Sequence, residues 1–377
     1  MNPKIKIVRT GNSGGPNHFL SRLEQEFKSK GITISDNNPA FVLSTKNVET
    51  SSNFALRLDG LDHEDHSFQT VKNKIFYRYN SYKKLFRMNN IIHKYFPILY
   101  RNFFRRVLNF FFFNKHNREQ IKGYENADLI IYQSKFSKNY FETFLGKPKK
   151  PNFIIYNGVD LNIFNPNIQI GKKVKNIMKA DFKIITSCSF RIHKRLHESL
   201  KLFKFVLKKI PTAKYFVMGH IDKQTKEIVD RIISFYEIEK NVVLLGKIPV
   251  SLIPEYYAEA DIMLYPSWLD PCPNSVVECL ASGTPVICPD SGGVKELVRK
   301  GGIVVPEKKI PKIDFTPYYC LSEIPEINYK VYLNSVLKIQ KNINEYSKKA
   351  RSVAEENLDI VQVSKKYLDA FNQITNV

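Results

Sequence analysis

Segments of strand character and segments of helix character alternate in two blocks along the chain, and this pattern limits the possible folds more than any other feature. In the first block, short apolar runs at residues 4–10 and 40–45 flank an amphipathic segment at 16–31. The alternation restarts in a second block over residues 181–287. Strands that alternate with helices form mostly parallel sheets covered by helices. The sequence therefore predicts an α/β protein with two doubly wound domains.

The length of 377 residues fits two domains of ordinary size. We place the first domain at residues 1–165 and the second at 175–358, and we interpret the turn-rich segment 159–176 as the linker between them. Ligands of open parallel sheets bind beyond the carboxyl ends of the strands. If the strand ends of the two domains face each other, the binding site is a cleft between them.

A basic and aromatic segment interrupts the first block at about residues 70–118. Between His66 and Arg118 the chain has a dozen Lys and Arg, many Phe and Tyr, and no Asp or Glu. The pattern predicts a two-sided helical insertion. Such helices bind anionic membrane surfaces, here through residues 76–113, but the aromatic side chains could equally pack a small helical subdomain.

The formal net charge of +22 favours anionic partners such as phosphorylated substrates, acidic lipids or nucleic acid. We find no known nucleic-acid-binding module in the sequence, which argues against nucleic acid. The chain has no signal-peptide pattern and no apolar run long enough to cross a membrane. Its five cysteines are odd in number and lack CxxC spacing, as in reduced thiols. We expect a cytoplasmic protein, with attachment to the cytoplasmic face of a membrane as one option.

Arg191 and Lys194 follow a predicted strand and precede an amphipathic helix. Two cations in this position can clamp a diphosphate, because Arg binds phosphate with two parallel hydrogen bonds and Lys contributes a point charge. Cations oppose the macrodipole at a helix start, and this local conflict favours a binding role. The alternative is a solvent-exposed basic helix start.

Two glycines, Gly14 and Gly15, lie between the first strand and the first helix. Glycines allow a phosphate or a sugar to approach the backbone amides of a helix N-terminus. A tight turn would explain them equally well.

Two acids, Asp270 and Glu278, flank a Pro-Cys-Pro-Asn turn at the start of a predicted helix. Ser275 and Glu278 have the spacing of a capping box, in which the Glu side chain only closes its own helix. The alternative is a polyol site, in which Asp270 and the free amides of the first helical turn bind hydroxyl groups.

The stretch DPCPNSVVECLASGTPVICPDSGGVKELV, residues 270–298, resembles the acid-x7-acid signature of retaining GT-B glycosyltransferases, the glycosyl transferases group 1 of the family-four type. FRIHKRL resembles their Arg/Lys diphosphate motif. ADLIIYQSKFSKNYF and IIYNGVDLNIFNP resemble the end of their first domain, and ALRLDG resembles one branch of the family. The likeness runs from about residue 4 to 306, with the basic insertion as a gap.

The resemblance implies a role for each matching residue. Glu278 would bind the ribose of a nucleoside-diphosphate sugar, and Arg191 and Lys194 would neutralise the diphosphate as it leaves. Asp270 would hold the sugar hydroxyls together with the backbone of four residues, which are Cys272, Pro273, Asn274 and Ser275.

Further roles follow from the same resemblance. Gly14 and Gly15 would approach the phosphate or sugar from the first domain, and the turn from Gly246 to Ile248 would frame the base. The sequence departs from the family at two places. Asp270 stands where Glu is more usual, and the run from Arg57 to Gly60 replaces a common His. Asp59 would then take the place near the anomeric carbon.

As a whole, the resemblance implies a GT-B fold, with two Rossmann-like domains facing across a cleft and a C-terminal helix at about 359–377 returning to the first domain. It also implies a retaining glycosyltransferase that needs no metal or cofactor. The donor would be a UDP- or GDP-sugar, and the acceptor a glycan, a lipid-linked molecule or another hydroxyl. The alternative function is a basic membrane- or nucleic-acid-binding protein on a GT-B-like scaffold without transferase activity.

Overall fold

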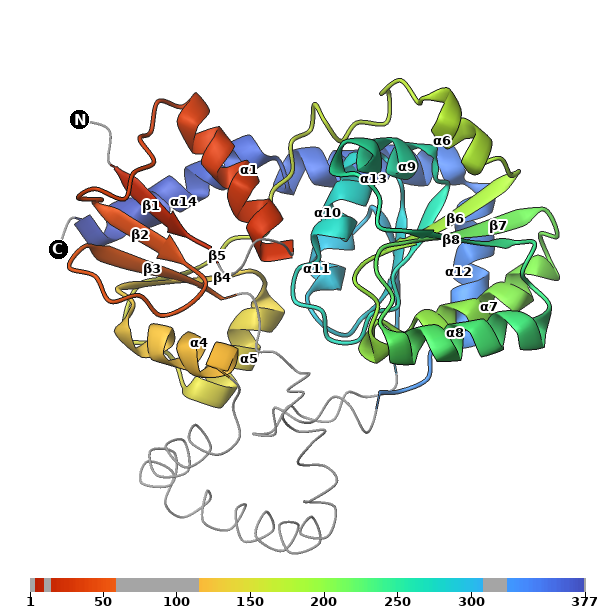
Figure 1. Cartoon of the computed structure of the whole chain (residues 1–377), viewed down its shortest axis with the longest axis horizontal. Coiled ribbons are helices and arrows are strands. Elements are labelled where there is room, and N and C mark those ends of the chain that lie inside the picture. The colour runs from red at the N-terminus through yellow and green to blue at the C-terminus, as the bar shows by residue number, and fades with distance from the viewer. Residues whose placement is uncertain (1–3, 10–14, 59–114, 308–323, 376–377) are drawn as a thin grey trace, which may run out of the picture.

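The structure is a computed structural model that describes residues 4–9, 15–58, 115–307 and 324–375. Two parallel sheets lie side by side in it, each with helices packed on it (Figure 1). This arrangement confirms the predicted α/β class with two doubly wound domains. The basic aromatic insertion expected at about 70–118 lies outside the described residues, except for its last four residues.

Among the described residues the first sheet has five strands in the order β1-β2-β3-β4-β5, and every pair is parallel. The strands are β1 Ile5–Val8, β2 Phe41–Ser44, β3 Asn53–Leu58, β4 Leu129–Tyr132 and β5 Asn152–Ile154. The helices of this domain that lie in the described ranges are α1 Gly15–Ser29, α4 Lys115–Asn126 and α5 Lys135–Leu145. In α1, the apolar residues that recur every three or four positions are buried against the sheet: Phe19, Leu20, Leu23 and Phe27.

The second sheet has six strands in the order β11-β10-β9-β6-β7-β8, again all parallel. They are β6 Phe182–Ser187, β7 Ala213–Met218, β8 Val242–Gly246, β9 Ile262–Leu264, β10 Val286–Pro289 and β11 Gly302–Val305. The helices are α7 Leu196–Leu207, α8 Lys223–Tyr236, α9 Ile253–Glu259, α10 Asn274–Ala281, α11 Val294–Val298, α12 Tyr329–Lys341 and α13 Ile343–Asn357. Short 3-10 helices precede α7 and α9, at Ile192–Lys194 and Val250–Leu252.

The segment predicted as an irregular linker, residues 159–176, contains the start of a short helix, α6 Lys172–Ile177. The backbone N–H of Gly171 donates to Glu255 at 2.7 Å, and Val174 is buried. These long-range contacts explain the difference, because a six-residue helix has too little periodicity to be read from the sequence.

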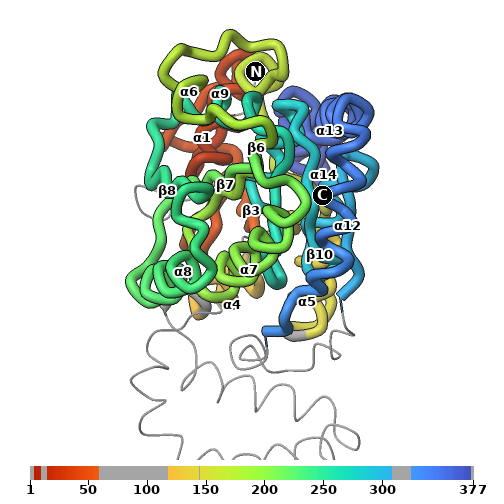
Figure 2. Tube along the Cα trace, turned by 90° about the vertical axis from the view of Figure 1, so that its right-hand side faces the viewer, coloured from red at the N-terminus to blue at the C-terminus, as the bar shows by residue number. Residues whose placement is uncertain are grey.

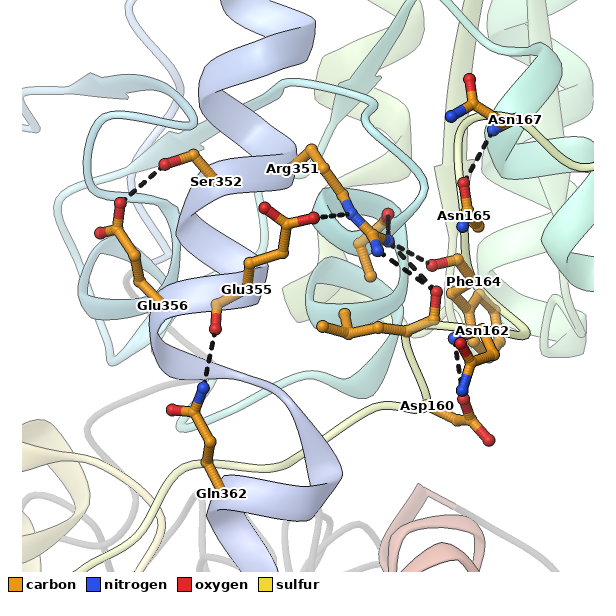
Figure 3. A network of polar contacts seen from close by, with 12 residues as sticks. Asp160, Asn162, Phe164, Asn165, Asn167, Arg351, Ser352, Glu355, Glu356 and Gln362 are labelled. Atoms are coloured by element: carbon orange, nitrogen blue, oxygen red, sulfur yellow. Dashed lines mark hydrogen bonds and ion pairs between the residues drawn. The ribbon is translucent and has the colours of Figure 1, made fainter.

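Arg351 of α13 fixes the linker in place (Figure 3). Its guanidinium donates to the carbonyls of Phe164 at 2.8 Å and Ala281 at 2.7 Å, and more weakly to that of Leu161 at 3.3 Å. A linker anchored to the end of α10 in this way has less freedom than its Asn-rich sequence suggests.

The chain crosses between the domains twice, and the two crossings are hydrogen-bonded to each other. Val159 N–H donates to Leu358 O at 2.8 Å, and Ile360 N–H donates to Val159 O at 3.0 Å. The last helix, α14 Ile360–Thr375, then packs on α1 and the first sheet through Tyr367 and Phe371. Figure 2 shows α12, α13 and α14 along one side of the molecule.

Cys188, Cys272, Cys279 and Cys288 are free thiols. The helices of the described ranges include none that is long and apolar enough to cross a membrane.

Candidate functional site

The turn between β9 and α10 and the helix start that follows it form the centre of the site. Leu269 has a positive φ of 53° at this turn, a conformation that non-glycine residues rarely adopt. Such strain persists only where the surroundings impose it, and here Trp268, Leu269 and Asp270 are all buried.

Asp270 is 8% exposed and is paired with two side chains of its own domain. Lys194 Nζ forms an ion pair with Asp270 Oδ2, and the Tyr265 hydroxyl donates to the same oxygen at 2.8 Å. Burial raises the pKa of this carboxyl, but the Lys194 charge, the two hydrogen bonds and His193 outweigh burial and leave the pKa below its usual value. Asp270 is therefore an anion at neutral pH, with its position fixed by Lys194 and Tyr265.

Lys194 is the last residue of the 3-10 helix that follows β6, and Arg191 is the N-cap of that helix. The backbone N–H of Trp268 donates to His193 O at 2.9 Å, so this helix is bonded directly to the turn that precedes Asp270. Arg191 is half-buried. The structure thus places Lys194 against Asp270 and Arg191 at the far end of the same short helix.

Arg195, which the sequence did not single out, supports this loop from inside. It has a left-handed conformation, with φ 53°, and is fully buried. Its guanidinium donates to Pro266 O at 2.5 Å and to Pro325 O at 3.0 Å, and it pairs with Glu307 at 2.6 Å. In the sequence, Arg195 looks like one more cation of a basic motif. In the structure, its contacts support the loop.

Two glycines after β10 allow the neighbouring loop to approach Asp270. Gly293 N–H donates to Asp270 O at 2.9 Å, and Gly292 has a φ of 76°. A Cβ at Gly293 would lie 2.0 Å from Pro271 O and 2.6 Å from Ser134 Oγ of the first domain. This position therefore requires glycine for reasons of space rather than of φ.

We expect Gly293→Ala to destabilise the protein, because the atoms that its methyl would meet include backbone and cannot move cheaply. Overpacking of this kind costs about 1–3 kcal/mol. Thermal unfolding monitored by circular dichroism would show a lower Tm. Gly15→Ala is the control, because its added Cβ would meet only Asn274 Nδ2, at an ordinary 3.7 Å. Equal Tm values for the two variants would contradict the packing that we describe.

The N-terminus of α10 is open, and the capping-box interpretation of Ser275 and Glu278 is wrong. Pro273 is the N-cap residue and forms no side-chain cap. Val276 and Val277 N–H contact Pro273 O at 3.2 and 3.4 Å, so these two amides are not the free ones. In the part of the chain that the structure describes, nothing accepts from the amides of Asn274 and Ser275. Two donors at a helix N-terminus can bind hydroxyl or anionic groups.

Glu278 does not turn back to its own helix but pairs with Arg22 of α1, in the other domain. Glu278 is 7% exposed, and the Arg22 guanidinium also lies over the Phe164 ring, 5.2 Å from its centroid. Arg22 Nη1 has no acceptor among the described residues. No local pattern in the sequence indicates this pair, because its members are 256 positions apart.

Gly15 lies at the start of α1, and its carbonyl accepts from Asn274 Nδ2 at 2.6 Å. The first domain therefore touches the turn through this glycine. Gly14 and Asp59 fall outside the described residues. Gly246 ends β8 with a φ of 67°, and a Cβ added there would meet nothing within 4 Å. Ile248 packs on the core cluster that contains Val276 and Val277.

Glu296 of α11, another residue that the sequence analysis missed, caps a helix of the first domain. Its carboxylate accepts from the N–H groups of Lys135 and Phe136, both at 2.8 Å, and from the Tyr156 hydroxyl at 3.1 Å. Ser134 caps the same helix by accepting from Ser137 N at 3.0 Å. An acid at a helix N-terminus is favourable, so this contact stabilises the present arrangement of the domains.

Across the described ranges, no three His, Cys, Asp or Glu side chains gather in a way that could hold a metal ion. The structure brings together Lys194, Asp270, Asn274, Ser275 and Gly15 around one turn, with Glu278 one helical turn further along α10.

Residues 167–313 match the family model of the glycosyl transferases group 1. The uncharacterized glycosyltransferase MJ1059 of Methanocaldococcus jannaschii is 29% identical over 202 residues, which are 52% of this chain and 47% of that protein. The processive diacylglycerol alpha-glucosyltransferase of Acholeplasma laidlawii is 26% identical over 184 residues, 48% of this chain and 52% of that protein. The matched part spans about half the length of each of these relatives.

Solved structures resemble the chain over its whole length. The Anabaena protein Alr3699/HepE in complex with UDP and glucose has a TM-score of 0.64 at 13% identity, covering 99% of this chain and 100% of that one. Sucrose-phosphate synthase from Thermosynechococcus elongatus has a TM-score of 0.63 at 15% identity, covering 100% of both chains. Together with the two parallel sheets, these likenesses confirm the predicted GT-B fold.

Proposed function

We propose that the protein is a retaining, metal-independent glycosyltransferase that moves a sugar from a nucleoside-diphosphate sugar to a hydroxyl acceptor. One observation carries the proposal: the fixed anion of Asp270, the open amides of Asn274 and Ser275, and the Glu278 carboxylate occur in this order along one turn and one helix. The match of residues 167–313 to the glycosyl transferases group 1 supports it.

Each group has a chemical task in this proposal. Glu278 accepts hydrogen bonds from the ribose hydroxyls, and Asp270 with the two amides binds the hydroxyls of the sugar. Lys194 and Arg191 neutralise the diphosphate. When the bond between the anomeric carbon and the diphosphate oxygen breaks, negative charge grows on the leaving oxygen, and these cations stabilise it. The acceptor oxygen bonds to the anomeric carbon on the same face, and its proton passes to the departing diphosphate oxygen.

Independence from metal rests on these two cations, which can supply the charge that a divalent ion supplies elsewhere. UDP as the nucleotide is supported by the Anabaena neighbour, whose structure contains UDP and glucose. GDP stays an alternative. A lipid-linked acceptor is supported by the resemblance to a diacylglycerol alpha-glucosyltransferase, and a glycan is the other acceptor class.

Attachment to an anionic membrane through residues 76–113 remains a prediction from the sequence. It would use the eight Lys and Arg of this segment, which contains no Asp or Glu. Flotation with anionic liposomes should recover the intact chain and lose the form without residues 76–113. Equal recovery of both forms would exclude the insertion as the anchor.

The ion pair between Arg22 and Glu278 leads to a prediction about donor affinity. A ribose that binds Glu278 must share the carboxylate with Arg22 or displace it. We expect Arg22→Gln to tighten the binding of UDP or GDP, because the ribose then no longer has to displace the guanidinium from the largely buried Glu278 carboxylate. Isothermal titration calorimetry measures this. Weaker binding would contradict competition and would make Arg22 itself a donor ligand.

The experiment that tests the function is a screen of UDP-, GDP- and ADP-sugars for release of the nucleoside diphosphate. We expect one of these donors to be hydrolysed slowly without acceptor and faster with an added glycan or lipid acceptor. NMR of the new glycosidic bond reports retention, and full activity in EDTA reports independence from metal. Release from none of them would refute the proposal.

A further inference from the structure

A buried polar chain lies behind the Pro-Cys-Pro-Asn turn and begins at Arg57 of β3. Arg57 is fully buried, and its guanidinium lies over the Phe19 ring, 4.5 Å from the centroid. Arg57 Nη2 donates to Asn157 Oδ1 at 2.6 Å. A cation buried in this way costs free energy, so its retention calls for an explanation beyond packing.

Asn157 follows β5, just before the chain first crosses between the domains, and it is 3% exposed. Its side-chain nitrogen donates to Cys272 O at 2.9 Å and to Asn274 Oδ1 at 2.7 Å, while its oxygen accepts from Arg57. Its backbone N–H also contacts Cys272 Sγ at 3.4 Å. Both ends of the amide are therefore used, and its orientation is fixed, because a flipped amide would set its oxygen against two other oxygens.

The chain of hydrogen bonds then returns to the first domain. Asn274 accepts from Asn157 and donates to Gly15 O at 2.6 Å. The polar chain thus runs from β3, through the crossing segment, to the turn before α10, and ends at the first residue of α1. It fixes the Cys272 carbonyl and the Asn274 side chain, which flank Pro273, the N-cap residue of α10.

We propose that Arg57 and Asn157 are positioning residues for the sugar part of the donor. They set the direction in which the amides of Asn274 and Ser275 point. They also make that direction depend on how the first domain docks on the turn. This inference rests on the proposed function. Glu278 is not a member of the chain, because its partner is Arg22. A substitution that disturbs this polar chain should therefore impair the positioning of the sugar and leave the affinity for the nucleotide unchanged.

Asn157→Asp tests this with the smallest change in shape. The new carboxylate still accepts from Arg57, but it can no longer donate to Cys272 O and Asn274 Oδ1 and will repel both oxygens. We expect the turnover of the nucleotide sugar to fall ~10- to 100-fold, as misplacement by about 1 Å does elsewhere. The affinity for the matching nucleoside diphosphate should stay within about twofold, since the change spares Glu278.

The first probe is the UDP-, GDP- or ADP-sugar that the wild-type chain hydrolyses fastest, and its turnover is measured from initial rates. The second probe is the matching nucleoside diphosphate, and its affinity is measured by calorimetry. Asn167→Asp is the matched control, because it makes the same change further along the chain, in the linker, where the Asn167 side chain is exposed and bonds to no described residue. It should behave as wild type.

The outcomes separate the possibilities. No hydrolysis of any donor by the wild-type chain would overturn the proposed function, and this inference with it. If the wild type is active, normal turnover in Asn157→Asp would overturn the positioning role. So would an equal loss of affinity for nucleotide and nucleotide sugar with a lower Tm, which is what a purely structural Asn157 predicts.

Asn274→Asp provides a second route should Asn157→Asp not fold. Asn274 is only half-buried, and its carboxylate variant keeps the acceptor for Asn157 but loses the donor to Gly15 O. We expect the turnover of the nucleotide sugar to fall about tenfold in this variant, while the affinity for the nucleotide is preserved. Wild-type turnover in this variant would overturn the link to the first domain.

Discussion

Glu278→Gln is expected to lower the affinity for the nucleoside diphosphate roughly 100-fold, the largest effect on binding that the structure predicts. Hydrogen bonds to a charged group contribute about 1.5–3 kcal/mol each, and the change removes the charge on which both ribose hydroxyls depend. The side chain keeps its size, so the packing of α10 is preserved. Isothermal titration calorimetry with UDP and GDP measures the loss.

Arg22→Gln is the matched control, because it breaks the same interdomain ion pair from its other end. Both variants should therefore show similar decreases in Tm, while only Glu278→Gln loses nucleotide. If the two variants bind nucleotide equally, Glu278 serves the interface between the domains and not the ribose.

Lys194→Met should lower turnover ~10²- to 10³-fold, the largest effect on rate. Removing one group that stabilises developing charge in an active site has this magnitude elsewhere. The change also leaves Asp270 with Tyr265 as its remaining close partner, and burial then raises the pKa of the Asp270 carboxyl. The loss should be greater at low pH, where a carboxyl with a raised pKa takes up a proton and loses its charge. Initial rates between pH 5 and 8 measure both effects.

Lys201→Met serves as the control for Lys194. Lys201 lies on α7 and pairs with the buried Glu198 at 2.9 Å, so its loss also breaks an ion pair with a buried acid. We expect a lower Tm and normal turnover. Turnover in Lys194→Met within twofold of wild type would mean that Lys194 only holds Asp270 in the fold.

The order of strands and helices could be predicted because the local sequence pattern of most segments agrees with the secondary structure that they form. Fully buried runs such as Leu129–Tyr132 read as strands, and α1 shows its buried face in its spacing of Phe and Leu. Gly31, with a φ of 74°, is the last residue of the segment predicted as the first helix, two residues beyond the end of α1. The short helix α6 was missed because tertiary contacts, rather than its own sequence, define it.

The site could be predicted only where its members are neighbours in sequence. Asp270, the turn and Glu278 lie within one motif, and Lys194 belongs to another. The capping-box interpretation was wrong for a local reason: Pro273 is the N-cap of α10, so Ser275 lies inside the first turn rather than at the N-cap.

The partners that the sequence did not reveal come from the other domain. Arg22 appears as an ordinary polar residue on the helix pattern of α1, and Glu296 as an ordinary acid of α11. Asn157 lies in the stretch IIYNGVDLNIFNP, whose resemblance implies the end of the first domain but no role for this residue. Contacts over more than 100 positions depend on how the domains dock, and no local pattern encodes that.

The most direct test compares initial rates of nucleoside diphosphate release from UDP-, GDP- and ADP-sugars for the wild-type chain, Glu278→Gln and Lys194→Met. We expect the wild type to hydrolyse at least one donor. Glu278→Gln should need a much higher concentration of that donor to reach the same rate, and Lys194→Met should be slow even when the donor is saturating. Equal rates for all three chains, or no hydrolysis by the wild type, would contradict a donor site built on Asp270, Lys194 and Glu278.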